Sequence, residues 1–455
     1  MTFLLERFKK FADTIAFVHN ERELTYSQVL SKIDEYSSLI EKNGVRSGQV
    51  VCLLGDYSPE IFSFLLALMK NGNVVCPLTY DSVVEKDKVF EIAEVQWFVK
   101  FSNDQSSIEF VSFERKVTNA LLKKLVEKNE AGLVLFSSGS TGTPKGMLHQ
   151  FSTVLNRYSV ERKPTAAIVF LMFDHFGGLN TLFGLTSSGG KVITVHDRSV
   201  KTVCSSIERH KVELLPTTPS FLNMIVHTGA YKSFDLTSLK KITYGTEVMP
   251  QATLDRLNTL FPTVTLQQTY GLSELGVLSS KSRPDGSLWV KIGGEGFNLK
   301  IKEGTLWIKS EFAMLGYLNA PDPFDEEGWF NTQDQVEVEG EYFRILGRTT
   351  DLINVGGQKV YPTEIENVVL ALPNIEDAVV YSETNPLLGQ MIVVEVKILN
   401  EEPLLELKKR IRSECLKKLA SYKVPSKVVI AKGDLYSQRM KKKRFAVGKS
   451  ESPQA

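Results

Sequence analysis

The strongest constraint on the fold is a strand–helix–strand pattern in the first hundred residues. Residues 50–54 form a short apolar run, and a second run follows at 73–76. Between them, Ser58-Pro59 is a typical helix start, a capping side chain followed by proline at the first helical position. Residues 61–69 are apolar except for one serine and would form that helix. Two strands joined by a helix of this length predict a parallel crossover and an α/β core.

Helix and strand patterns continue on both sides of this unit. Thr25 and Gln28 have the spacing of a capping box, the next apolar residues recur at helical spacing, and Gly44 would end that helix. A similar alternation of helix and strand extends to about residue 300. We therefore expect a large α/β domain in the amino-terminal part of the chain.

The last hundred residues predict a separate small α+β domain. Residues 378–381 and 391–398 have the composition of strands. A helix is expected after them, because four apolar side chains follow at the spacing of one helix face: Leu404, Leu407, Ile411 and Cys415.

Composition narrows the class of protein. A chain of 455 residues suggests two to four domains, and the balance of 54 Lys+Arg against 53 Asp+Glu gives no reason to expect nucleic acid as a partner. No apolar run approaches the roughly 20 residues of a membrane-spanning helix, and the first residues lack the apolar core of a signal peptide. The four cysteines lack C-x-x-C spacing, which favours reduced thiols in a cytoplasmic protein.

A glycine-rich segment follows the apolar strand expected at 133–136. Residues 137–146 read SSGSTGTPKG and combine hydroxyls, three glycines and a lysine, a set that suits a bound phosphate. The segment is neither a P-loop, since Pro144 replaces its second glycine, nor a G-x-G-x-x-G loop. Composition alone leaves phosphate binding and an ordinary solvated turn equally open.

The full string is more specific, because it resembles the phosphate loop of the adenylate-forming superfamily. That superfamily includes acyl- and aryl-CoA synthetases, luciferases and peptide-synthetase adenylation domains. Further segments resemble its other motifs in order and spacing over about residues 10–445: 268–274 (QTYGLSE), 304–319 (GTLWIKSEFAMLGYLN), 328–334 (GWFNTQD), 347–351 (GRTTD) and 356–366 (GGQKVYPTEIE).

The resemblance implies a two-domain enzyme and a two-step reaction. A domain of layered α/β subdomains at 1–348 would bind ATP and the acid, a hinge would lie at 349–350 with Thr350, and a mobile α+β domain would span 351–455. A carboxylic acid would attack ATP to give an acyl-adenylate and pyrophosphate. A thiol, most simply that of coenzyme A, would then displace AMP. Magnesium would accompany ATP.

The same resemblance implies roles for individual residues. Catalytic roles fall to Glu274 as magnesium ligand, His175 at the acid's carboxylate, Thr269 and Lys441. Gly356 and Gly357 would leave room for the thiol. The residues expected to bind ATP are Ser137, Ser138, Gly139, Ser140, Thr141, Gly142, Lys145, Gly245, Thr246, Glu247, Gln268, Tyr270, Gly271, Ser273, Asp334 and Arg348.

Within this set, Tyr270 would stack on adenine, Asp334 would accept the ribose hydroxyls, and Arg348 would contact the nucleotide. Gln333 departs from the superfamily, which usually has glycine before that aspartate. Asp174, next to His175, is interpreted as structural.

The carboxyl-terminal catalytic lysine is ambiguous. Setting Ser437 and Arg444 on the superfamily's T-x-x-x-K-x-x-R spacing selects Lys441, whereas counting from Leu435 selects Lys442. Met440 then replaces a glycine. The basic cluster at 439–444 could also be a nucleic-acid or membrane contact, an interpretation that we disfavour because no wider basic face accompanies it.

Two other functions stay open. A stand-alone adenylation enzyme would load the acyl group onto the phosphopantetheine of an acyl carrier protein instead of coenzyme A. A catalytically weak nucleotide-binding or regulatory protein would explain the altered terminus and Gln333. The identity of the acid is not legible in the sequence.

Overall fold

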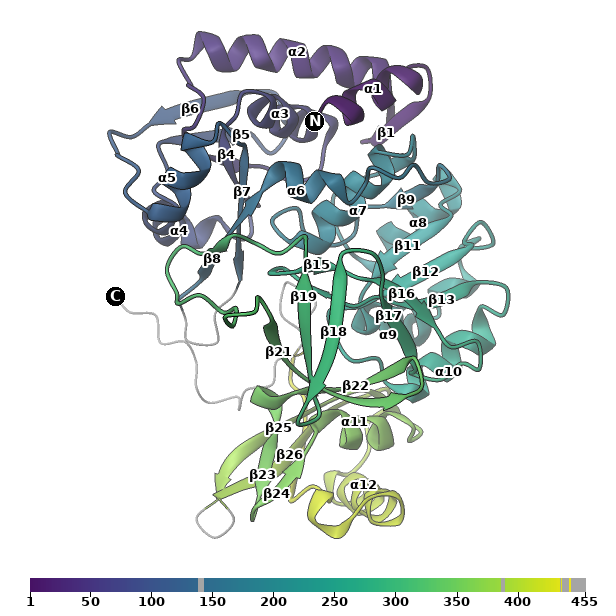
Figure 1. The fold of residues 1–455 in the computed structure, drawn as a ribbon. Coiled ribbons are helices and arrows are strands. Elements are labelled where there is room, and N and C mark those ends of the chain that lie inside the picture. Colours follow the sequence, from purple (N-terminus) through teal and green to yellow (C-terminus); the bar gives the residue numbers. More distant parts are fainter. Residues whose placement is uncertain (138–142, 386–388, 434, 436–441, 443–455) are drawn as a thin grey trace.

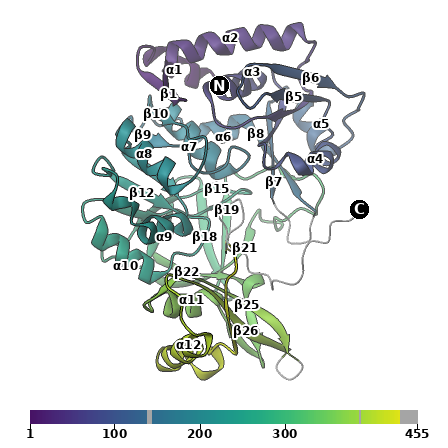
Figure 2. The same ribbon diagram turned by 180° about the vertical axis from the view of Figure 1, so that it is seen from behind.

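The computed structural model describes residues 1–137, 143–385, 389–433, 435 and 442 (Figure 1). Two seven-stranded sheets lie side by side in the upper part of the molecule, and a six-stranded antiparallel sheet lies below them. A small α+β domain forms the lower end, as Figure 2 shows from behind. The expected α/β fold class, a large amino-terminal domain with a smaller carboxyl-terminal one, is confirmed.

The first sheet contains the predicted crossover. Its strands run in the order β20-β8-β7-β4-β3-β5-β6. β3 and β4 are parallel with Cys52 opposite Cys76, and the Ser58 hydroxyl caps α3. The elements of this part are α2 (Tyr26–Lys42), β3 (Val50–Leu54), α3 (Pro59–Lys70), β4 (Val74–Leu78), α4 (Lys86–Ile92), β5 (Trp97–Phe101), β6 (Ile108–Ser112), α5 (Ala120–Glu127), β7 (Gly132–Ser137), β8 (Lys145–Gln150), α6 (Phe151–Asn156) and β20 (Gly316–Tyr317).

The second sheet is mostly parallel, in the order β13-β12-β11-β9-β10-β1-β2. Every neighbouring pair from β13 to β1 is parallel, so the carboxyl ends of these strands share one edge. Its elements are α1 (Thr2–Lys10), β1 (Ile15–His19), β2 (Arg22–Thr25), β9 (Ala166–Ile168), α7 (Phe176–Thr186), β10 (Lys191–Ile193), α8 (Val200–His210), β11 (Leu214–Thr217), α9 (Pro219–Thr228), β12 (Lys241–Tyr244), α10 (Gln251–Leu260) and β13 (Thr265–Gln268).

Helix α3 lies between the two large sheets. Every residue from Ile61 to Met69 is buried, which explains why this segment is apolar on all sides rather than on one face. The ring of Phe62 packs 5.5 Å from Phe17 of the second sheet, and the ring of Phe64 packs 5.4 Å from Phe101 of the first. Both sheets therefore share one core.

The predicted alternation of helix and strand to residue 300 is wrong after β13. From there the described chain continues with antiparallel strands, because short turns such as Glu303-Gly304 (φ +51° and +74°) reverse it without a helix. The six-stranded sheet has the order β16-β17-β22-β21-β19-β18. Its strands are β16 (Ser279–Ser282), β17 (Val290–Gly293), β18 (Phe297–Lys302), β19 (Thr305–Ser310), β21 (Phe330–Glu339) and β22 (Tyr342–Arg348). Before them, β14 (Gly271–Leu272) and β15 (Gly276–Val277) form a separate antiparallel pair.

The small domain packs two helices on one sheet. Leu407, Ile411 and Cys415 of α12 are buried as expected, but Leu404 is half exposed because it is the first residue of that helix. Hydrogen bonds join the domain to α9 and α10. They run from Asn223 Nδ2 to the carbonyl of Glu376 (3.0 Å), from Arg256 Nη2 to that of Leu370 (3.2 Å) and from the Gln251 N–H to Oδ1 of Asn367 (3.0 Å). The elements are β23 (Ile353–Val355), β24 (Gln358–Val360), α11 (Pro362–Leu370), β25 (Ile375–Asn385), β26 (Gly389–Ile398), α12 (Leu404–Lys418) and β27 (Lys427–Ile430).

Two expectations from composition can be compared directly with the structure. The cysteines at positions 52, 76, 204 and 415 are free and buried, as expected for reduced thiols. In the described part of the chain, no helix is both long enough and apolar enough to cross a membrane.

Candidate active site

A cavity of about 340 Å³ opens at the shared carboxyl edge of the second sheet. Ligands of open α/β sheets bind at this kind of edge. Loops after β13, β12, β11, β9 and β10 form its wall, and β7 of the first sheet closes one side. The structure brings many of the predicted residues together on this wall: Ser137, His175, Gly245, Thr246, Thr269, Tyr270, Gly271, Ser273, Glu274 and Arg348.

The base of the glycine-rich segment is anchored by the chain around β20. Ser137 and Lys145 pair as the last and first residues of β7 and β8, while 138–142 lie outside the described residues. Asn319 accepts a hydrogen bond from the Gly146 N–H (3.0 Å) and donates one to the Pro144 carbonyl (2.9 Å). The side chain of Asn319 therefore fixes the returning end of this segment.

Glu274 lies close to that anchor. The Tyr317 hydroxyl donates a hydrogen bond to Oε1 of Glu274 at 2.8 Å. Lys145 Nζ lies 5.2 Å from the centre of the Tyr317 ring, a cation–π contact. One tyrosine thus links the predicted metal ligand to the predicted phosphate lysine. Neither Tyr317 nor Asn319 is assigned a role by the sequence reasoning, although both lie in the 304–319 motif.

Three predicted nucleotide residues contact one another. The Tyr270 hydroxyl donates to Oδ2 of Asp334 (2.5 Å), and Nε of Arg348 lies 3.4 Å from Oδ1. Asp334 faces Arg348 directly across β21 and β22. Burial raises the pKa of the Asp334 carboxyl, and burial together with the neighbouring Asp334 raises that of the Tyr270 hydroxyl. Asp334 is buried against Tyr270 and Arg348 rather than part of the cavity lining.

Gln333 adopts a backbone conformation that explains the usual glycine at this position. Its φ is +60°, in the left-handed region that costs a side chain energy. The side chain of Gln333 is exposed, and its backbone N–H donates a hydrogen bond to Oδ1 of Asn331 at 2.9 Å. The substitution therefore adds backbone strain at this site but leaves Asp334 buried beside Tyr270 and Arg348.

His175 and Asp174, at the start of α7, differ in their relation to the cavity. His175 is the N-cap residue of α7, and its partly exposed side chain lines the cavity. Asp174 is buried, with Oδ1 3.9 Å from Nε2 of His175, and does not line the cavity. This placement favours the structural interpretation of Asp174.

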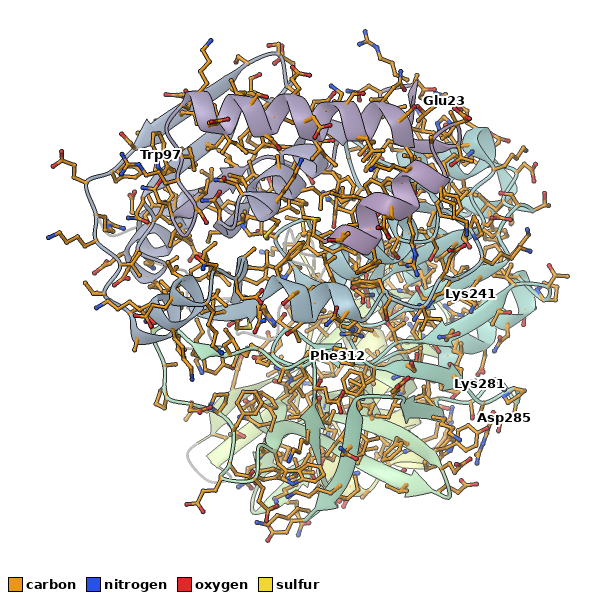
Figure 3. All side chains as sticks on the ribbon, turned by 45° about the horizontal axis from the view of Figure 1, so that its top comes forward. Glu23, Trp97, Lys241, Lys281, Asp285 and Phe312 are labelled. Carbon is orange, nitrogen blue, oxygen red and sulfur yellow. The ribbon has the colours of Figure 1, made fainter. Side chains whose placement is uncertain are left out.

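The hairpin that carries Glu274 is held by Arg157. This guanidinium donates to the Val277 carbonyl and lies 5.1 Å from the ring centre of Phe312, which Figure 3 labels. The sequence reasoning gives Arg157 no role, because its partners are distant in the chain.

Other predicted residues lie away from the cavity. Gln268 ends β13 with its side chain buried, and Glu247 accepts a hydrogen bond from the Ser220 hydroxyl. Gly356 and Gly357 form the turn between β23 and β24 in the small domain. Thr350 is exposed in a 3₁₀ turn, Thr349–Asp351, directly after β22.

Lys441 lies outside the described residues, whereas Lys442 is described. Lys442 Nζ donates to the carbonyl of Ala378 (2.8 Å) and to Oε2 of Glu366 (3.3 Å), and it lies 3.7 Å from Oδ1 of Asp377. Its side chain is only 10% exposed. Lys442 therefore belongs to a buried charge cluster of the small domain in this conformation.

Comparison with known proteins identifies the family. The AMP-binding enzyme family matches residues 4–86 and 81–318, and the AMP-binding enzyme C-terminal domain matches 364–442. The chain belongs to the AMP-binding enzymes. The resemblance to adenylate-forming enzymes is confirmed, as is the expected enzyme class, the AMP-forming acid–thiol ligases.

Named relatives cover most of the chain at low identity. An indoleacetate–CoA ligase of Aromatoleum aromaticum is 25% identical over 90% of this chain and 89% of its own length. A 2-succinylbenzoate–CoA ligase of Bacillus pumilus is also 25% identical, over 93% and 92%. The crystal structure of an anthranilate CoA ligase in complex with anthranoyl-AMP has the same fold, with a TM-score of 0.82, 19% identity, and coverage of 96% of this chain and 94% of that one.

Proposed function

We propose that this protein activates a carboxylic acid with ATP and transfers the acyl group to coenzyme A. The observation that carries the proposal is a cavity lined by Glu274, Tyr270 and Arg348. Beside it, Tyr317 links Glu274 to Lys145. A cation, a carboxylate and hydroxyl donors around one cavity suit a polyphosphate that must meet a second anion.

In the first step, an oxygen of the substrate carboxylate attacks the α-phosphorus of ATP, and the bond to the β-phosphate oxygen breaks. Acyl-adenylate and pyrophosphate are the products. Lys145 would stabilise the departing phosphates, and His175 would orient the attacking carboxylate. Tyr270 would stack on the adenine, and Asp334 would have to open toward the ribose from its present contacts with Tyr270 and Arg348.

The residues fit a magnesium ion that arrives with ATP. No cluster of three or more metal-ligating side chains occurs in the residues that the structure describes, so a permanent all-protein site is not indicated there. Magnesium commonly uses one or two carboxylates together with substrate phosphates. Glu274 would supply such a carboxylate, and the bound ion would neutralise charge that develops on the phosphates.

In the second step, a thiolate would attack the acyl carbonyl and AMP would leave. The turn with Gly356 and Gly357 would approach the cavity after the small domain rotates about Thr350. Coenzyme A is proposed as acceptor because the named relatives are CoA ligases. A carrier-protein acceptor remains the second candidate. The buried reduced cysteines support a cytoplasmic location.

The test is a pyrophosphate-release screen with ATP and magnesium over acetate, medium-chain, aryl and amino acids. We expect pyrophosphate release with at least one acid. Thioester formation with release of AMP is expected only when coenzyme A is added. Thioester formation with a phosphopantetheine carrier but not with coenzyme A would favour the second candidate. Absence of pyrophosphate–ATP exchange with every acid would support a nucleotide-binding or regulatory protein.

A further inference from the structure

An arginine lies at the end of the cavity farthest from the nucleotide residues. Arg198 follows β10 and lines the cavity, whereas Tyr270 and Glu274 follow β13. The strand order between them is β13-β12-β11-β9-β10. Since neighbouring strands lie about 4.8 Å apart, these four steps separate strands β13 and β10 by roughly 19 Å. Arg198 therefore enters the cavity from a strand well removed from the one that precedes Tyr270.

The wall between these ends is largely apolar near Arg198. Phe170, Leu171 and Met172 after β9 line it, together with Phe176 at the start of α7. His175 lies beside Phe176 and marks the predicted position of the reacting carboxylate. An acid held there would extend its carbon skeleton along the apolar wall and bring its other end to Arg198.

The guanidinium of Arg198 is incompletely satisfied by the protein. Its Nε donates to the Phe170 carbonyl at 2.7 Å, which fixes the plane of the group. Nη2 lies 3.6 Å from Oδ1 of Asp56, beyond hydrogen-bond distance, and that oxygen already accepts the Tyr57 N–H at 2.8 Å. Within the described chain no hydrogen bond involves Nη1. The side chain is only 15% exposed and lines the cavity, so a ligand in the cavity can reach this guanidinium.

A second polar group supports a ligand in the same cavity. Thr217 ends β11 and lines the cavity, and its hydroxyl is buried without a hydrogen-bond partner in the part of the chain that the structure describes. Buried donors without partners are costly unless a ligand supplies an acceptor. An arginine fork matches a carboxylate in shape and charge.

Resting on the proposed function, we propose that Arg198 binds a second carboxylate at the far end of the acid, so that the substrate is a dicarboxylic acid. One carboxylate would be activated near His175, and the other would stay free and paired with Arg198. Asp56 would weaken this pairing, because its own charge competes for the same guanidinium. The established family membership does not determine this choice of substrate.

The experiment compares acids of equal length that differ at one end. Adipate, its monoamide and hexanoate form one set, and 4-carboxyphenylacetate and 4-methylphenylacetate form another. We expect kcat/KM for AMP formation to favour the diacid over its neutral-ended partner by about tenfold or more in the wild type. Arg198→Met should remove this preference with the KM for ATP unchanged, Arg198→Lys should keep part of it, and Asp56→Asn should lower the KM for the diacid.

A diacid preference that is absent in the wild type, or unchanged in Arg198→Met, would overturn the proposal. Should Arg198→Met fail to fold, the diacid preference of Arg198→Lys is compared with that of the wild type instead, because lysine keeps the charge and loses the planar fork. Calorimetric binding of the diacid separates this proposal from the proposed function. If no acid is activated but the diacid binds and Arg198→Met abolishes binding, the subsite stands and the ligase reaction fails. Absence of binding to the wild type overturns the subsite.

Discussion

Glu274 is held by a tyrosine 43 positions further along the chain. The Tyr317 hydroxyl occupies one carboxylate oxygen, and no hydrogen bond within the described residues involves the other. Burial raises the pKa of Tyr317, as does the adjacent Glu274, so the hydroxyl stays protonated and remains a donor. The hydrogen bond orients the carboxylate of Glu274 and leaves its other oxygen available to a ligand in the cavity.

The variant Glu274→Gln tests this arrangement. Glutamine can still accept the Tyr317 hydrogen bond, so we expect the fold to persist. The loss of charge should lower the rate of adenylate formation about a hundredfold or more, and raise the magnesium concentration needed for half-maximal rate. Pyrophosphate–ATP exchange measured against magnesium checks this. Tyr317→Phe is the matched control and should lower the rate of adenylate formation about tenfold. Exchange near the wild-type rate in Glu274→Gln at limiting magnesium would contradict the assignment.

Lys442 is a poorer control for Lys441 than the sequence suggests. Lys441 was the predicted catalytic lysine, and Lys442→Ala should be mild if Lys442 lies in solvent. The structure instead buries Lys442 between Glu366 and Asp377. Burial raises the pKa of Asp377, although the Lys442 charge opposes that shift.

We therefore expect Lys442→Ala to destabilise the small domain by about 3 kcal/mol or more, because two buried carboxyls lose their cation. Lys441→Ala should leave the unfolding midpoint unchanged and abolish adenylate formation, while a supplied acyl-adenylate still forms thioester. Urea unfolding and the two half-reactions check these outcomes. Loss of adenylation in Lys442→Ala at temperatures where it remains folded would favour Lys442 as the catalytic lysine.

Residues inside contiguous motifs could be predicted, and those fixed by distant contacts could not. Tyr270, Glu274 and Arg348 were predicted and line one cavity. Arg198 carries no motif, because its place depends on the order of strands in the sheet rather than on its neighbours in the chain.

Among the elements, β22 connects the site to the second domain. Arg348 is its last residue, and the 3₁₀ turn Thr349–Asp351 follows at once. Beyond that turn the chain enters β23 of the small domain. A hydrogen bond from the Thr363 hydroxyl to the Leu346 carbonyl (2.9 Å) joins the small domain to β22. A rotation of the small domain would therefore concentrate its backbone change in this turn.

Thr350→Pro should restrict that rotation. Proline fixes φ near −65° at its own position and restricts the residue before it. We expect the variant to fold, since Thr350 is exposed, and one half-reaction to be lost while the other survives. Our expectation is that adenylation survives and thioester formation falls at least tenfold. Rapid-quench measurement of each half-reaction checks this; an equal loss of both in a folded variant would refute the hinge.

Elements were predictable where apolar runs and capping residues define them. The strand β3 and the capped helix α3 match the expected segments. The strands from β14 to β22 could not be predicted, because they are short and pair through local turns that resemble the loops of an α/β domain.

At the scale of the whole molecule, a buried histidine joins the two large sheets. His149 lies on β8 of the first sheet and packs 5.3 Å from the ring of Phe176 on α7. It is 1% exposed, and burial lowers its pKa from 6.5 to about 4. The histidine is neutral in the folded protein, whereas the unfolded chain protonates it below about pH 6.5.

Stability should consequently fall as the pH drops from 6.5 toward 4, because only the unfolded state takes up this proton. We expect His149 to contribute about 2 kcal/mol to the loss of unfolding free energy between about pH 7.5 and about pH 5. His149→Met keeps the packing and should show a correspondingly smaller loss. Urea unfolding of both proteins at the two pH values checks this; parallel pH profiles would show that His149 is not responsible.

The position of α3 between the two sheets sets an order for folding during synthesis. One face of the helix packs on Phe17, whose strand β1 is completed only by pairing with Val192 of β10. A ribosome must therefore add more than a hundred residues after α3 before that neighbour exists. Until then the apolar residues at 61–69 lack the second sheet as a packing partner. Slowed translation before β10 should therefore increase aggregation of the nascent chain more than slowed translation after β10.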